Sequence, residues 1–116
     1  MEENDYFQVR NTNNILKLRE IQRELPSFCL EFFRGIENNT TPLTRLNYAY
    51  DLRIFFNFLV SEVVDFEDRK IKELTIEDLN KITATHLEIY LDYLNYYTGK
   101  DGKVYKNNEK AKSRNF

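Results

Sequence analysis

The sequence has one histidine, His86, and one cysteine, Cys29, as candidates for acid–base or nucleophilic chemistry. His86 falls in the first turn of an expected helix, so we interpret it as a surface or cap-adjacent residue and not as a general base. Cys29 lies in the apolar pattern of Phe28, Phe32 and Ile36, which predicts a buried thiol and no nucleophile. A single cysteine also excludes an intramolecular disulfide.

The eight tyrosines are the remaining candidates for covalent chemistry. Half of them share one expected helix and are interpreted as its core and rim: Tyr90, Tyr93, Tyr96 and Tyr97. No Cys/His cluster has zinc spacing, no glycine-rich loop is suited to phosphate, and the acids are scattered over expected helix exteriors. We therefore expect no catalytic residue, no cofactor and no metal ion.

Charge is distributed unevenly along the chain. The net charge of −2 gives no general attraction to a polyanion. The first 99 residues carry 11 basic and 17 acidic side chains. From Lys100 onward the chain has six basic residues and two acidic ones, Asp101 and Glu109. That C-terminal segment, at +4, is either a solvated terminus or a phosphate-contacting one.

The segment from Thr40 to Leu59 predicts the longest helix. Thr41 can cap the first turn, and Pro42 suits the first helical position because its missing N–H is no loss there. We expect a helix from Pro42 to about Val64, packed by one face made of Tyr48, Ala49, Leu52, Phe55, Phe56, Leu59, Val60 and Val63.

The other segments favour an all-α fold, a compact bundle of four to five helices. Residues 1–13 are polar and are expected to be a disordered or appended arm, and residues 14–116 to be one domain. Further helices are expected at about 14–24 and at 27–37, the latter burying Phe28, Phe32, Phe33 and Ile36. A short helix is expected over 75–82, with Thr75 and Asp78 as a capping pair.

The next helix begins at either Thr83 or Thr85, and both caps remain open, because Thr85 has Glu88 at capping-box spacing. It should fray near Thr98 and bury Leu87, Tyr90, Leu91, Leu94 and Tyr97. Asp101-Gly102 is a hairpin-type turn, from which Val104 and Tyr105 lead toward a last helix that starts near Asn107.

Four segments together resemble the N-terminal core-binding domain, also called SAM-like, of tyrosine recombinases and phage-type integrases. The family pattern Thr-x-x-x-Tyr-x-x-Asp-Leu-x-x-Phe-x-x-Phe-Leu is similar to Thr44, Tyr48, Asp51, Leu52, Phe55, Phe58 and Leu59. Leu25–Phe33 resembles the family's first domain helix, and Asn108–Phe116 the start of its last one. Ile82–Leu94 resembles its helix with the pattern Ile-Thr-x-x-(Asp/His)-Leu-x-x-Tyr-Leu-x-x-Leu. In the family that last helix continues, so here it is expected to be truncated.

This resemblance implies a DNA-binding domain that clamps duplex DNA at a recombination site, in DNA integration and recombination. The residues carried over as DNA contacts are Thr44, Arg45, Asn47 and Tyr48 at the start of the long helix, and Lys112, Ser113 and Arg114 in the last one. Arg45 is expected to face the groove and to contribute little to stability. The implied partners are double-stranded DNA, a catalytic domain of the same parent chain, and other recombinase protomers. The family's catalytic residues lie in that separate domain, so this chain is not expected to be an enzyme.

The acidic N-terminal start lacks the features of a signal peptide, and no apolar run approaches the ~20 residues that span a bilayer. A cytoplasmic location without membrane contact is expected. The alternative function is a helical protein–protein interaction module that presents an exposed patch of Phe58, Tyr93 and Tyr96. A stand-alone enzyme is a distant third.

Overall fold

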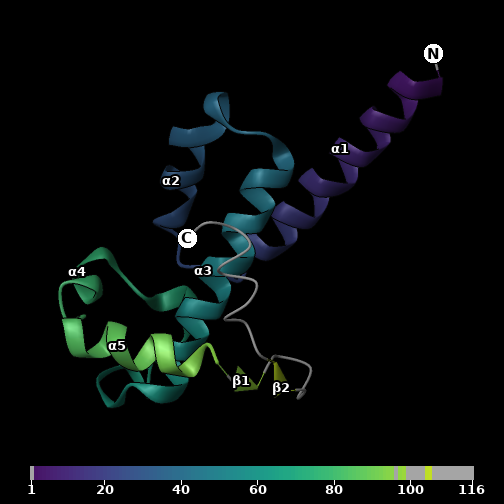
Figure 1. Ribbon diagram of the computed structural model, residues 1–116. Coiled ribbons are helices and arrows are strands. Elements are labelled where there is room, and N and C mark those ends of the chain that lie inside the picture. Colours follow the sequence, from purple (N-terminus) through teal and green to yellow (C-terminus); the bar gives the residue numbers. More distant parts are fainter. Residues whose placement is uncertain (1, 96, 99–103, 106–116) are drawn as a thin grey trace. The chain divides into compact units, whose positions relative to one another are not determined.

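The computed structural model describes the backbone of residues 2–95, 97–98 and 104–105, and the side chains of residues 6–95. The expected all-α class is confirmed: the described residues form five α-helices (Figure 1). These are α1 (Glu2–Gln22), α2 (Cys29–Ile36), α3 (Pro42–Glu62), α4 (Ile76–Leu79) and α5 (Ala84–Tyr93). Three short 3-10 helices connect them, η1 (Glu37–Asn39), η2 (Val64–Phe66) and η3 (Ile71–Glu73).

The chain divides into two compact units, Met1–Ile76 and Glu77–Phe116. The expectation of one domain over residues 14–116 stays a prediction. The second unit contains α5 and a minimal antiparallel ladder of β1 (Tyr97–Thr98) and β2 (Val104–Tyr105), in which Tyr97 pairs with Tyr105. The hairpin expected around Asp101-Gly102 is consistent with this pairing, although the turn residues and the last helix lie outside the described residues.

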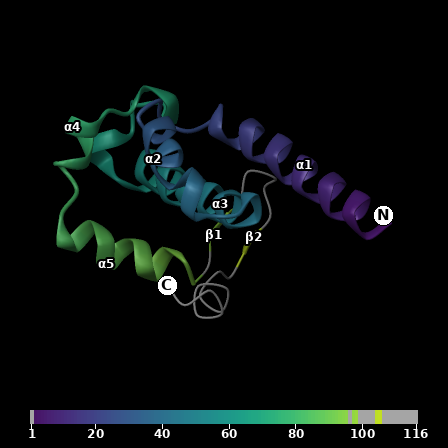
Figure 2. The same ribbon diagram turned by 90° about the horizontal axis from the view of Figure 1, so that it is seen from above.

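α1 begins at Glu2, so the helix start expected near Asn14 was wrong. Of the two expectations for residues 1–13, a disordered or an appended arm, this helix contradicts only the first. No proline or glycine interrupts the sequence before Pro26, and the acids Glu2, Glu3 and Asp5 favour a helix N-terminus through its dipole. Figures 1 and 2 show the N-terminal half of α1 extending past α2 and α3. Hydrophobic spacing failed there because residues 6–13 are all exposed, among them Tyr6, Phe7 and Val9.

The core of the first unit is formed where the C-terminal half of α1 packs against α3 and where α2 joins them. Ile21 and Ala49 have no exposed surface, and Phe28 of the α1–α2 turn meets the Phe56 ring edge-on at 6.1 Å. Glu24 and Arg53 add an ion pair of 3.0 Å between the end of α1 and α3. The buried apolar residues of this unit are Leu18, Ile21, Leu25, Cys29, Phe33, Leu46, Ala49, Phe56, Phe58, Leu59, Val63, Phe66 and Leu74.

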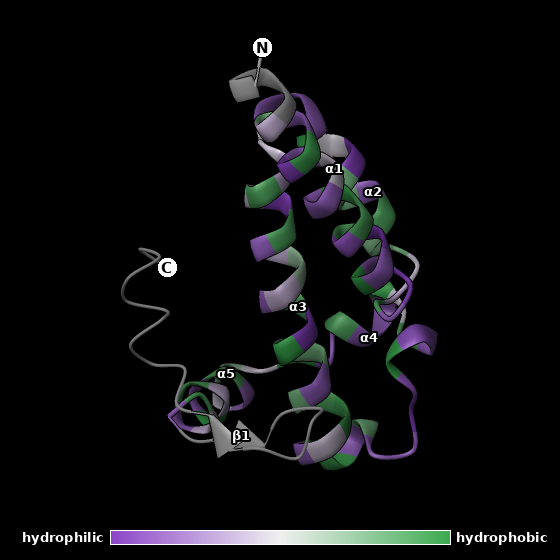
Figure 3. Ribbon diagram, turned by 90° about the vertical axis from the view of Figure 1, so that its right-hand side faces the viewer, coloured by the Kyte–Doolittle hydropathy of each residue, from purple (hydrophilic) through white to green (hydrophobic). Residues whose placement is uncertain are grey.

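α3 is buried on more than the one face that its pattern predicts. Phe56 and Phe58 are both at most 3% exposed, yet two residues apart they point to nearly opposite sides of a helix. Tyr48, expected in the core, is 40% exposed instead. Figure 3 shows hydrophobic and hydrophilic residues alternating along α3. The expected inward face was therefore right for Ala49, Phe56, Leu59 and Val63 and wrong for Tyr48, and it left out the buried Phe58.

The shorter helices also depart from their expected contacts. α2 buries Cys29 and Phe33, but Phe32 is 45% exposed. The helix expected over residues 75–82 is the four-residue α4. α5 ends at Tyr93, well before Thr98, and Leu87 and Leu91 are exposed while Leu94 is buried.

Candidate nucleic-acid interface

The start of α3 is capped as the sequence predicted. Thr41 Oγ1 accepts a hydrogen bond from the Thr44 N–H at 3.2 Å, and Pro42 occupies the first turn. The hydroxyl oxygens of Thr41 and Thr44 also lie 3.0 Å apart, so Thr44 takes part in the cap through its side chain as well. Because this hydroxyl has a hydrogen-bond partner within the helix start, the role of Thr44 in the structure is to stabilise that start.

Arg45 does not face outward as expected, and this prediction is corrected. The residue is only 9% exposed. Its Nη1 donates to the carbonyl oxygens of Glu37 at 3.0 Å and of Thr40 at 2.7 Å, and to Thr40 Oγ1 at 3.2 Å. Thr40 Oγ1 in turn donates to the Ile36 carbonyl oxygen at 2.6 Å. Arg45 therefore pairs carbonyl groups left free where α2 ends, a place where a cation is favoured.

Asn47 and Tyr48 remain as the accessible candidates on α3. Asn47 is half-buried, and its amide makes no side-chain hydrogen bond to another described residue. The Tyr48 ring lies 6.3 Å from the ring of Phe32 on α2, which holds it against the surface. The second predicted set, Lys112, Ser113 and Arg114, lies outside the described residues.

The expected aromatic interaction patch is not found where it was placed. Phe58 has no exposed surface, Tyr93 is half-buried with its ring stacked 6.3 Å from that of Tyr90, and Tyr96 lies outside the described residues. Besides Tyr6 with Phe7 on α1, an exposed aromatic pair is formed instead by Phe32 and Tyr48. Both were expected in the core because they occupy helical spacing, and spacing cannot say which flank of a helix stays uncovered.

His86 closes the open question of the α5 cap. Thr83 Oγ1 accepts from the His86 N–H at 3.2 Å, and His86 Nδ1 accepts from the Thr83 N–H at 3.0 Å. The pair forms a capping box with Thr83, not Thr85, as the cap residue. The interpretation of His86 as a cap-adjacent residue is thus confirmed, because its backbone N–H and its Nδ1 both pair with Thr83.

Cys29 is buried, as its spacing predicted. Burial raises the pKa of its thiol from 9.0 to about 11, since the thiolate loses solvation. A thiol in this state is a poor nucleophile at neutral pH. Among the residues that the structure describes, no group of three or more His, Cys, Asp or Glu side chains could hold a metal ion.

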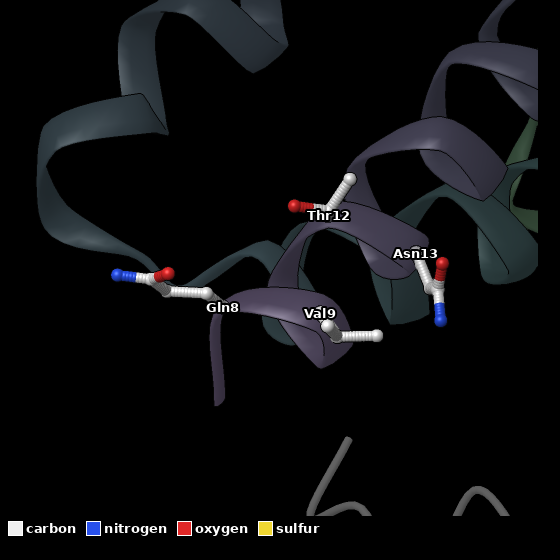
Figure 4. A pocket seen from close by; sticks show the side chains of 4 residues that line it. All are labelled: Gln8, Val9, Thr12 and Asn13. Carbon is white, nitrogen blue, oxygen red and sulfur yellow. The ribbon is translucent and has the colours of Figure 1, made fainter. Parts of the chain in front are cut away.

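Two surface hollows complete the description of the first unit. One, of about 390 Å³, is lined by Gln8, Val9, Thr12 and Asn13, all from α1 and all uncharged (Figure 4). The other, of about 430 Å³, brings together Arg19 of α1, Arg34 of α2 and Arg45 of α3. The sequence analysis missed this arginine cavity. Arg34 and Arg45 follow Arg19 by 15 and 26 positions, and the three residues meet only through the packing of three helices.

Comparisons of the chain with protein-family models, curated proteins and solved structures found no match. No helix in the described part of the chain has the length and apolar character needed to cross a membrane.

Proposed function

We propose that the chain is a DNA-binding module of the kind found in tyrosine recombinases and integrases, which contacts duplex DNA through the start of α3. The observation that carries the proposal is the accessible pair Asn47 and Tyr48 on the second turn of α3. The buried face of this turn packs into the core, which fixes the position of the helix. Leu46 and Ala49 are buried beside them, and Arg45 ties the same turn to the end of α2.

This arrangement suits a recognition helix because the contacting side chains need no ordering of the backbone on binding. An asparagine amide can pair with adenine through a donor and an acceptor, and a tyrosine hydroxyl can donate to a phosphate oxygen. The resemblance of the Thr44–Leu59 segment to core-binding domains supports the same orientation. Arg45 supports the interface indirectly, through the position of α3. The module acts by binding and positioning, with no chemistry of its own.

The test is fluorescence anisotropy of labelled duplex DNA at two salt concentrations. We expect a dissociation constant of ~10⁻⁴–10⁻⁶ M at low salt, weakening as salt rises. Asn47→Ala should weaken binding several-fold. Asn57→Ala is the matched control, since Asn57 is a half-buried asparagine on the same helix ten residues on. Absence of binding at low salt, or equal losses in both variants, would contradict the proposal.

A second candidate, a protein–protein interaction module, is favoured by the exposed ring pair of Phe32 and Tyr48. Exposed aromatic side chains commonly form the centre of protein interfaces. The variant Tyr48→Phe separates the two functions, because it keeps the ring and removes the hydroxyl. It should weaken binding to DNA and leave an aromatic protein contact intact.

A further inference from the structure

The arginine cavity is lined by Arg19, Arg34 and Arg45 among others. The proposed DNA contact through Asn47 and Tyr48 gives these arginines no binding role. Its volume of about 430 Å³ is within the ~300–1,000 Å³ typical of small-molecule sites. Part of its lining is apolar: Leu30 is 44% exposed, whereas Leu18 at 5% and Phe33 at 4% belong to the core. The cavity thus combines cationic groups with hydrophobic surface.

Donor groups of Arg45 remain available in this cavity. A guanidinium has five N–H donors, and only Nη1 is engaged, by Glu37 and Thr40. Nε and Nη2 of Arg45 have no acceptor among the described residues. No side-chain nitrogen in the described part is fully buried without a partner, so Nε and Nη2 of Arg45 each keep some exposed surface. They form a fixed, pre-oriented fork suited to an oxyanion.

Arg19 and Arg34 complete the cationic lining. Both are exposed, and neither makes a side-chain hydrogen bond or ion pair with another described residue. Glu37 also lines the cavity and is the one acidic side chain there. Three guanidinium groups and one carboxylate leave a formal charge of +2, which matches a phosphate monoester, at about −1.5 to −2 near neutral pH.

We propose that this cavity binds a small phosphate monoester whose organic part carries a ring. The phosphate contacts the guanidinium groups of Arg45, Arg19 and Arg34, and Glu37 accepts from hydroxyl or amino groups of the ligand. The ring lies against Leu30, the exposed apolar side chain of the lining. An internal DNA phosphate fits less well, because it carries a single charge and a duplex cannot place a ring against a cavity floor. The site is independent of the proposed duplex contact on α3.

The test is isothermal titration calorimetry of the full chain at constant ionic strength with adenosine 5′-monophosphate as the probe. We expect one saturable site, with at least tenfold tighter binding than inorganic phosphate or adenosine alone, because each of these lacks one half of the interaction. Arg19→Gln and Arg34→Gln should each weaken binding about tenfold, the usual loss of one charged hydrogen-bond donor. Both replace exposed side chains, so folding is retained, and melting curves verify it.

Arg23→Gln is the matched control, because Arg23 is an exposed arginine four residues after Arg19 that does not line the cavity. It should leave the affinity unchanged. No saturable binding, equal affinity for inorganic phosphate, or an equal loss in the Arg23 variant would overturn the proposal. Competition by an unphosphorylated duplex would also overturn it, since the cavity would then be part of the DNA surface. Duplex binding without nucleotide binding would leave the proposed function standing alone.

Discussion

In the described part of the chain, α3 and α5 each start with a threonine cap, and the two starts are built differently. At α5 the cap is local: Thr83 and His86 exchange hydrogen bonds, and no residue of α5 itself is buried. At α3 the Thr41 cap is followed at once by Arg45, which bonds back across eight residues to Glu37. The same sequence signal, a threonine before a helix, thus precedes two different kinds of helix start. The start of α3 is stabilised by contacts with a distant segment, and the start of α5 by hydrogen bonds between neighbouring residues.

This difference bears on function, because a helix end that is fixed by tertiary contacts can present side chains in a set direction. The start of α3 uses Thr44 and Arg45 for structure and leaves Asn47 and Tyr48 accessible. The start of α5 has no such support within its own helix. Substitutions that remove the tertiary contacts of α3 and those that remove the local cap of α5 should therefore lower stability to different extents and in different places.

The largest expected effect comes from the core beneath α3. Phe56→Ala should lower the free energy of unfolding by ~3–5 kcal/mol, because it removes a ring that is 3% exposed and leaves a cavity. Phe32→Ala, at a position that is 45% exposed, should cost less than about 1 kcal/mol. Chemical denaturation measures both. Similar losses would mean that the two rings are equally buried, against the structure.

Arg45 gives the next largest effect. Arg45→Ala should destabilise the protein by about 1–3 kcal/mol, because the carbonyl groups of Glu37 and Thr40 lose their donor. Arg34→Ala is the control, as an exposed arginine without a described partner, and should change stability by less than about 0.5 kcal/mol. If both arginine variants melt at the same temperature as the parent, Arg45 has no structural role. The earlier prediction that Arg45 contacts the DNA groove would then be favoured again.

The two caps should differ in where their loss is felt. Thr41→Ala and Thr83→Ala should each cost about 1 kcal/mol of helix stability. Amide hydrogen exchange should show faster exchange beyond α3 in the first case, reaching Glu37–Thr40, and only within the first turns of α5 in the second. His86→Gln should preserve protection in α5, since glutamine can also complete a capping box, whereas His86→Ala should not. A uniform response in all four variants would remove the distinction between the two starts.

Cys29 tests the interior with the smallest perturbation. With its thiol pKa raised to about 11, native Cys29 should react very slowly with a thiol reagent at pH 8, and rapidly once denaturant exposes it. The raised pKa also means that the buried thiol's contribution to stability is complete below about pH 9 and is lost as pH rises toward 11. Cys29→Ala should therefore lose less stability over that range than the parent. Rapid labelling of the native protein would contradict the burial.

The local signals in the sequence were sufficient for the all-α class and for the start of α3, because Thr41 and Pro42 act on neighbouring backbone groups alone. They did not predict the first half of α1, where helix formation depends on uninterrupted polar residues and not on a buried face. They also misplaced Arg45, since its acceptors are supplied by the turn at Glu37–Thr40, whose geometry no spacing rule gives. Phe58 was misassigned for a related reason: a helix covered on several sides has no single inward face.

The candidate site was predicted in part. The helix that carries it was identified, and Asn47 and Tyr48 are accessible, but Thr44 and Arg45 are engaged in holding the helix. The arginine cavity could not be inferred, because it depends on how α1, α2 and α3 pack together.

The most direct measurement of the central proposal is a titration of the isotope-labelled protein with a short duplex, followed by NMR shifts of the backbone amides. We expect the largest shifts at Leu43–Tyr48, the start of α3 that carries Asn47 and Tyr48, with little change at the other end of the same helix from Asn57 to Glu62. The shifts should diminish as salt is added. Shifts centred away from the start of α3, or no shifts at low salt, would contradict DNA binding through this surface.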